Sequence, residues 1–247
     1  MKVWEKFLTE SDKAVFGDAG YGVKAGFGSR PAILIIDVNY AFCGHKPEPI
    51  LESVKTWRNS CGMVAWESLP HIQRLLESAR EQQLPVIYTT GKDRRPDNFD
   101  NGGWSRKNRR TTEEEVPLGI RGNEIMKEIA PVESDLYIEK LKPSAFHGTP
   151  LLGYLVDLGV DTLLICGTTT SGCVRASVID AFSYNFKVSI VEECTFDRGE
   201  ASHAINLFDM NAKYADVVSL DETVEYMETL SKEMFSDKIA FTPMVTK

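Results

Sequence analysis

The sequence predicts an α/β fold in which an open, mainly parallel sheet lies between two layers of helices. Short apolar runs alternate with stretches of helical pattern along most of the 247 residues. Three runs, at residues 32–36, 162–166 and 187–191, lack the polar–apolar alternation of a half-exposed strand, so both of their faces are expected to be covered. Helices between such strands favour parallel pairing through right-handed crossovers. We therefore expect a three-layer α-β-α sandwich.

Each strand is predicted from a short apolar run, and helix candidates lie between the runs. The expected strands, in chain order, are 32–36, 85–89, 136–138, 162–166, 187–191 and 216–219. The expected helices are 66–82, 123–129, 150–158, 173–184, 201–211 and 221–230. In the first of these helices Leu69, Ile72 and Leu76 recur at steps of three and four residues, which predicts one buried face.

Three stretches do not follow this alternation. Residues 1–29 form an arm with a Gly-rich segment, residues 43–65 an insertion after the first strand, and residues 91–118 a long, charged loop. Loops of that length in a compact domain are usually functional, so we expect 91–118 to be a lid or a subunit contact rather than only a solvated face. Because no linker or internal repeat is visible, residues 1–247 are expected to form one domain.

Composition excludes several classes of partner. The chain has 28 Lys and Arg against 36 Asp and Glu, a formal net charge of −8, and no Lys/Arg-rich run, so we expect no nucleic-acid partner. Its apolar runs are too short to span a bilayer and its first residues form no apolar signal core, so we expect a cytoplasmic protein without a membrane partner. Its five cysteines include no C-x-x-C pair and its four histidines no local metal spacing, which predicts free thiols, no metal and no cofactor.

Polar residues follow three of the predicted strands where those strands end. Asp37 comes directly after the first strand, Lys140 lies just past the third, and the loop Gly167-Thr-Thr-Thr-Ser-Gly-Cys173 leads from the fourth into a helix. Ligands of open α/β sheets bind beyond the carboxyl ends of the strands, so an acid, an amine and a thiol are expected to meet there. Spacing alone does not choose between Lys140 and Lys142.

Cys173 is the expected nucleophile. A position at a helix amino terminus is expected to lower the pKa of its thiol, and the preceding Thr, Ser and Gly residues supply N–H groups for an oxyanion hole. Cys166, inside an apolar strand, instead fits a buried structural cysteine. Asp37 would accept the thiol proton, and Lys140 would stabilise the charges of the Asp37–Cys173 pair.

These motifs resemble those of the isochorismatase-like cysteine hydrolases. The matching stretches are residues 30–37, 139–149 and 167–177, and with Asp197-Arg198 they resemble the N-carbamoylsarcosine amidase branch in particular, over about residues 30–220. The resemblance implies a Rossmann-like, isochorismatase-type sheet and an Asp37, Lys140 and Cys173 triad. It selects Lys140 over Lys142 because the family lysine precedes the Ser-Ala-Phe segment by four residues.

The resemblance implies further site features. A cis peptide bond between Thr168 and Thr169 would turn the Thr169 N–H, together with that of Cys173, toward an oxyanion. Arg198 would grip a substrate carboxylate or carbonyl, its alternative role being a helix-capping salt bridge. The segment after the second strand lacks the Asp-x-His motif of nicotinamidases, which argues against zinc and nicotinamide. Dimers or tetramers are implied, and the arm at 1–29 is long enough to wrap a neighbour.

The expected function is that of a metal-free cysteine amidohydrolase. It would cleave a terminal carbamoyl or amide C–N bond of a small ureido or amide compound, such as an N-carbamoyl amino acid or a biuret-like ureide, and release ammonia through a thioester. The alternatives are a maleamate-like acid amide hydrolase, a non-catalytic scaffold with an inert Cys173, a thiol redox protein and a zinc amidase. The alkylation rate of the thiol and metal analysis distinguish these classes.

Overall fold

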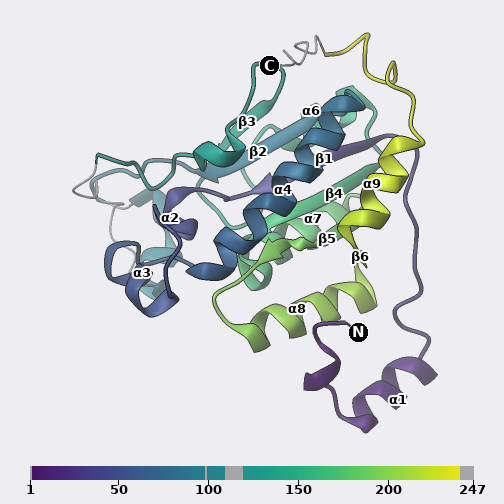
Figure 1. The fold of residues 1–247 in the computed structure, drawn as a ribbon, viewed down its shortest axis with the longest axis horizontal. Helices are drawn as coiled ribbons and strands as arrows, with labels where there is room; N and C mark the ends of the chain where they lie inside the picture. The colour runs from purple at the N-terminus through teal and green to yellow at the C-terminus, as the bar shows by residue number, and fades with distance from the viewer. Residues whose placement is uncertain (1, 98, 109–118, 240–247) are drawn as a thin grey trace.

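A six-stranded parallel sheet forms the centre of the computed structural model, which describes residues 2–97, 99–108 and 119–239 (Figure 1). The strand order is β3-β2-β1-β4-β5-β6. The strands are β1 (Pro31–Ile36), β2 (Val86–Gly91), β3 (Leu136–Lys140), β4 (Thr162–Thr168), β5 (Lys187–Phe196) and β6 (Asp216–Val218). The predicted α/β class with a parallel sheet is confirmed.

The sheet reverses its strand order between β1 and β4. From β1 the chain proceeds outward through β2 to β3, and from β4 it proceeds in the other direction through β5 to β6. Ile36, at the end of β1, pairs with Thr89 on one side and with Gly167 on the other. A reversal of this kind opens a crevice beyond the carboxyl ends of the two central strands. Asp37 and the loop that carries Cys173 follow those ends directly.

Helices cover both faces of the sheet. On one face α4 (Met63–Glu81) packs against α9 (Leu220–Glu228), and Leu69, Ile72 and Leu76 of α4 are buried as predicted (Figure 1). The connections that follow β3, β4 and β5 cross the opposite face. They contain α6 (Leu151–Leu158), α7 (Arg175–Ser183) and α8 (Glu200–Lys213). The two layers bury the sheet, and β1 and β4 are buried along their whole length.

One predicted helix is wrong. Residues 123–129 contain a single 3-10 turn, η3 (Lys127–Ile129), instead of a helix. Ile125 makes an isolated antiparallel bridge with Asn39, and the Met126 N–H donates to the Val38 carbonyl. The apolar residues of this segment are buried, but the segment is anchored to the chain that leaves β1, so its backbone cannot close helical hydrogen bonds.

The three stretches outside the alternation contain short helices. The arm holds η1 (Glu5–Phe7) and α1 (Glu10–Asp18), and its Phe16 packs edge-on against Phe208 of α8 at 4.7 Å between ring centroids. The insertion holds α2 (Tyr40–Cys43), which begins just before it, and α3 (Ile50–Thr56). The charged loop holds η2 (Phe99–Asn101) and α5 (Gly103–Asn108), while its residues 98 and 109–118 lie outside the described chain.

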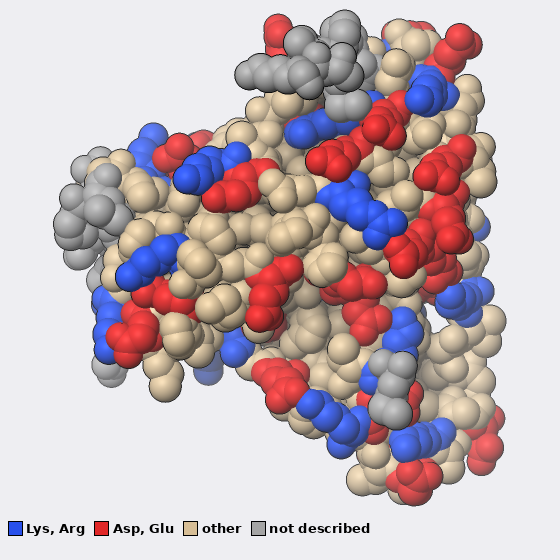
Figure 2. All heavy atoms as spheres, in the orientation of Figure 1, with Lys and Arg blue, Asp and Glu red and all other residues tan. Residues whose placement is uncertain are grey.

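The surface carries no continuous basic patch on the face that Figure 2 shows, where acidic and basic side chains are interspersed. None of the described helices is long and apolar enough to cross a membrane.

Candidate active site

Two of the three predicted catalytic groups are placed by strand ends. Asp37 follows β1 in the left-handed region, with φ of 55°, and its N–H donates to the Thr89 carbonyl at 3.0 Å. A non-glycine residue in that region is uncommon and strained, so the surrounding sheet must hold Asp37 there. Lys140 is the last residue of β3, which pairs with β2. Both side chains therefore project from the carboxyl edge of the sheet.

The structure brings Asp37, Lys140 and Cys173 together. The Lys140 Nζ donates to Asp37 Oδ2 at 2.7 Å, and each of these side chains is only 3% exposed. The Cys173 thiol lies beside both, close enough for each to shift its pKa. The competitor Lys142 is directed elsewhere, because its Nζ donates to the Asp100 carbonyl in the charged loop. The second carboxylate oxygen, Asp37 Oδ1, is buried and has no hydrogen-bond partner in the described part of the chain.

The protonation states in this cluster follow from burial and charge. Burial, and to a smaller extent the Asp37 carboxylate, raise the pKa of the Cys173 thiol to about 12, although the Lys140 ammonium acts in the opposite direction. Burial would lower the pKa of Lys140, but the neighbouring Asp37 and Cys173 outweigh it and the pKa is raised. At neutral pH the thiol is thus protonated and the amine charged. The expectation of a lowered thiol pKa is wrong, because dehydration of the side chain outweighs its position at the helix start.

The loop before Cys173 passes unusually close to β1. A Cβ atom on Gly167 would lie 2.1 Å from the Ile36 carbonyl oxygen, and Gly167 has φ of 106°, so only glycine fits there. The peptide bond between Thr168 and Thr169 is cis. Cys173 then lies in a π-helical turn, η4 (Thr170–Val174), which leads into α7.

Comparison with known proteins identifies the family. A family model described as Isochorismatase domain matches residues 31–222, well over half of the chain. The chain belongs to the isochorismatase family. This isochorismatase-family chain is 32% identical over 240 residues to N-carbamoylsarcosine amidase from Arthrobacter sp., which covers 94% of the chain and 84% of that protein. The resemblance to the N-carbamoylsarcosine amidase branch is confirmed, and with it the prediction of a hydrolase.

A second relative supports the assignment to the isochorismatase family, and a solved structure shows the same fold. Maleamate amidohydrolase from Pseudomonas putida is 32% identical over 217 residues, covering 85% of this chain and 93% of its own. A cysteine hydrolase from Pseudomonas syringae pv. phaseolicola superposes with a TM-score of 0.71 at 23% identity, covering 81% and 93% of the two chains. At that identity the likeness shows the fold alone.

One supporting residue of this isochorismatase-family site was not predicted. The Ser177 hydroxyl donates to the Cys173 carbonyl at 2.7 Å and accepts from the Ala145 N–H at 2.9 Å. It thereby ties the turn that carries the thiol to the segment that follows Lys140. Ser177 and Ala145 both lie in stretches that resemble the family, at residues 167–177 and 139–149. Their contact depends on how α7 packs against the segment after β3, which the spacing of residues in the sequence does not reveal.

Arg198 is exposed in the connection between β5 and α8. Its Nε and Nη2 both donate to the Asn59 carbonyl, at 2.9 and 2.6 Å, and its guanidinium lies 5.4 Å from the centroid of the Phe42 ring. Among the described residues its partner is therefore a backbone carbonyl of the insertion rather than a helix-capping carboxylate. The alternative of a helix-capping salt bridge is therefore wrong for the described residues, while substrate binding by Arg198 stays a prediction.

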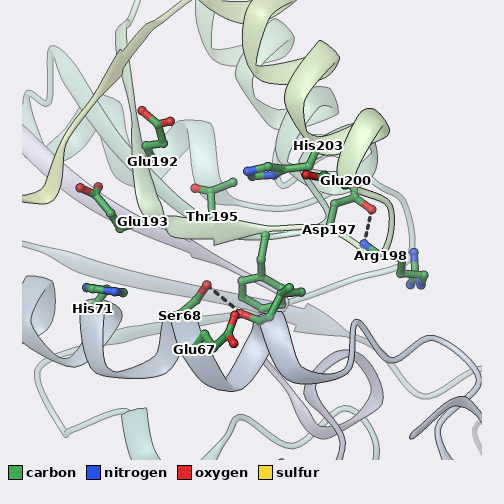
Figure 3. Close-up of a pocket in the computed structure, with 12 residues that line it drawn as sticks. Glu67, Ser68, His71, Glu192, Glu193, Thr195, Asp197, Arg198, Glu200 and His203 are labelled. Carbon is green, nitrogen blue, oxygen red and sulfur yellow. Dashed lines mark hydrogen bonds between the residues drawn. The ribbon is translucent and has the colours of Figure 1, made fainter. Parts of the chain in front are cut away.

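A cavity of about 430 Å³ lies beside the site, between α4, the end of β5 and the start of α8 (Figure 3). Asp197, Arg198 and His203 line it, whereas none of the three triad residues is among its described lining residues. Among the described residues, no group of three His, Cys, Asp or Glu side chains is arranged to hold a metal ion.

Proposed function

We propose that this member of the isochorismatase family is a cysteine amidohydrolase that cleaves a terminal carbamoyl or amide C–N bond of a small ureido or amide compound. The observation that carries the proposal is that the two carboxylate oxygens of Asp37 have different surroundings. One carboxylate oxygen is bound by Lys140, the other is buried and has no hydrogen-bond partner in the described part of the chain, and the protonated Cys173 thiol lies beside this carboxylate. That arrangement supplies a general base to the nucleophile at the moment of attack.

The reaction proceeds in two balanced steps. Cys173 Sγ bonds to the substrate carbonyl carbon as the thiol proton passes to Asp37, which then delivers it to the leaving nitrogen. The C–N bond breaks, ammonia leaves and a thioester remains on Cys173. Water next attacks the thioester and gives a proton through Asp37 to the departing sulfur, which restores the thiol and releases the acid. Lys140 remains charged throughout, and the N–H groups of Thr169 and Cys173 are proposed to stabilise the oxyanion.

The substrate class is inferred from the relatives and from Arg198. N-carbamoylsarcosine and maleamate, named in the two relatives, each combine a terminal amide with a carboxylate. We therefore propose an acidic substrate whose carboxylate interacts with the Arg198 guanidinium. An N-carbamoyl amino acid is the first candidate. A maleamate-like acid amide is the second, because maleamate amidohydrolase matches this chain at the same 32% identity.

Ammonia release from a panel of ureido and amide compounds tests the proposed function. Wild type is expected to release ammonia in the presence of a chelator, and Cys173→Ala to release none. Cys166→Ala, which removes a buried thiol from β4 outside the triad, is expected to retain activity and is the matched control. Mass spectrometry of wild type quenched during turnover should find the acyl group on Cys173. Absence of ammonia across the panel, together with absence of an acyl group on Cys173, would favour the non-catalytic scaffold.

A further inference from the structure

The β5–α8 connection holds the turn that carries Cys173 through a buried carboxylate. Asp197 is 8% exposed, and its Oδ2 accepts both the N–H of Ser171, at 2.8 Å, and the Ser171 hydroxyl, at 2.6 Å. Its other oxygen accepts the N–H of Arg198 at 2.7 Å. A buried carboxylate is costly unless its acceptor positions are used, and here two of the donors belong to a residue two positions before the nucleophile.

A second contact joins the η4 turn to α8, which follows the β5–α8 connection. The Thr170 hydroxyl and His203 Nδ1 lie 2.7 Å apart, and Figure 3 shows His203 close to Asp197, where β5 leads into α8. On the opposite side, the turn is bound through Ser177 to Ala145. The η4 turn is therefore held by hydrogen bonds from two segments, the β5–α8 connection with the start of α8 and the segment after β3. The contacts with the β5–α8 connection and α8 are made by Thr170 and Ser171, just before Cys173.

From these contacts we infer that Asp197 is a positioning residue of the reaction, which orients the η4 turn so that the Cys173 thiol faces the Asp37 carboxylate. The inference rests on the proposed function and deepens it. Asp197 does not touch the reacting atoms. It acts through Ser171, because its Oδ2 accepts both the N–H and the hydroxyl of that residue and so fixes their orientation. Misplacing a nucleophile by about 1 Å can slow a reaction by about a hundredfold, so loss of this contact should appear mainly in kcat.

Asp197→Asn tests the inference, because it keeps the volume, replaces one of the two acceptor oxygens with an NH2 donor and removes the negative charge that strengthens the Ser171 contacts. We expect kcat to fall by about 10- to 100-fold, with KM changed by less than about threefold. Ser171→Ala removes only the hydroxyl contact and should give a smaller loss of kcat. Asp216→Asn is the matched control. Asp216 is 5% exposed and accepts the N–H groups of Ala25 and Gly26, but it lies at the amino end of β6, away from the triad.

A second readout separates positioning from simple loss of stability. The pH dependence of Cys173 alkylation by iodoacetamide is measured well below Tm for the wild type and both Asp variants. Because the turn in Asp197→Asn no longer holds the thiol beside Asp37 and away from water, its alkylation profile is expected to shift to lower pH. Asp216→Asn should lower Tm and leave both kcat and the alkylation profile unchanged.

The outcomes of these measurements are distinguishable. Equal kcat values and alkylation profiles for Asp197→Asn and wild type would overturn the positioning role while the proposed function stands. A wild type that releases no ammonia would instead remove the proposed function. In that case an alkylation profile unchanged in Asp197→Asn still overturns the positioning inference, and a profile shifted to lower pH still supports it.

Discussion

The Asp37–Lys140 pair is buried in the site, and its two members depend on each other. Taking either charge out of water costs several kcal/mol, which their 2.7 Å contact offsets. Removing one partner therefore leaves an uncompensated charge rather than a neutral gap. The second oxygen of Asp37 is buried without a hydrogen-bond partner in the described part of the chain, so under the proposed function stability and catalysis would depend on the same contact.

Lys140→Met is expected to reduce both stability and activity. The free energy of unfolding should fall by about 3 kcal/mol, because Asp37 is left as a buried unpaired charge, and kcat should fall by more than about a hundredfold. Urea unfolding and ammonia release measure the two effects. The control is Lys142→Met, whose Nζ contacts the charged loop instead of Asp37, and which should retain activity. Similar losses in both variants would contradict the choice of Lys140.

Arg198→Ala is expected to change substrate binding more than chemistry. Removal of the guanidinium should raise KM for acidic substrates by about tenfold or more, with little effect on neutral ureides, because only the former carry a carboxylate to pair with it. Steady-state kinetics on an acidic and a neutral substrate of similar size make the comparison. An unchanged KM for the acidic substrate would mean that Arg198 only holds the insertion through Asn59.

At the scale of elements, the close approach of β1 and β4 determines the shape of the site. Ile36 pairs with Gly167 where the order of the sheet reverses, and both Asp37 and the η4 turn begin within a few residues of that pair. The site is therefore as rigid as the centre of the sheet on which it is built. A change that separates the two strands at this point should disturb Asp37, Lys140 and Cys173 together.

Gly167→Ala is expected to be strongly destabilising, because the added Cβ would collide with the Ile36 carbonyl oxygen and φ of 106° is unfavourable for alanine. We expect a fall in Tm and loss of ammonia release. The matched control is Gly153→Ala in α6, where a Cβ meets nothing within 4 Å, and which should stabilise the protein by up to about 1 kcal/mol. A Gly167→Ala variant as stable as wild type would show that the two strands can move apart here.

For the whole molecule, burial of the thiols links stability to alkaline pH. Cys43, Cys61, Cys166, Cys173 and Cys194 are all buried, and burial raises the pKa of each thiol above its ordinary value of 9.0. In the unfolded chain these thiols ionise near that ordinary value. Because the folded state retains their protons longer, its stability is complete below about pH 9 and is lost as the pH rises further.

Urea unfolding at pH 8 and pH 10 should show this loss. Each buried thiol is expected to contribute on the order of 1 kcal/mol of destabilisation at pH 10, one pH unit above its unfolded pKa. For Cys166→Ala, the fall in the free energy of unfolding between pH 8 and pH 10 should be smaller than for wild type. This comparison does not depend on how stable the variant is at pH 8. Equal losses in wild type and in this variant would contradict the linkage to Cys166.

Much of the fold and of the site could be predicted from local sequence. The β1 and β4 runs were predictable because strands buried on both faces need continuous apolar residues, and α4 because its apolar side chains recur on one face. Asp37 and Cys173 were predictable because the carboxyl ends of parallel strands share one edge. The choice of Lys140 over Lys142 required the family motif and agrees with the contact that Lys140 makes.

Other features were decided only by the tertiary structure. Residues 123–129 have an apolar pattern that fits a helix, yet their bridge to Asn39 prevents one. The pKa of Cys173 depends on how completely the folded chain excludes water from the thiol, and the contacts of Asp197 and Ser177 depend on how β5 and α7 approach the η4 turn. By itself the sequence determined the elements and the residue types at the sheet edge, because these follow from local pattern. Dehydration and long-range hydrogen bonds arise only when distant segments pack together, so they were decided by the tertiary structure.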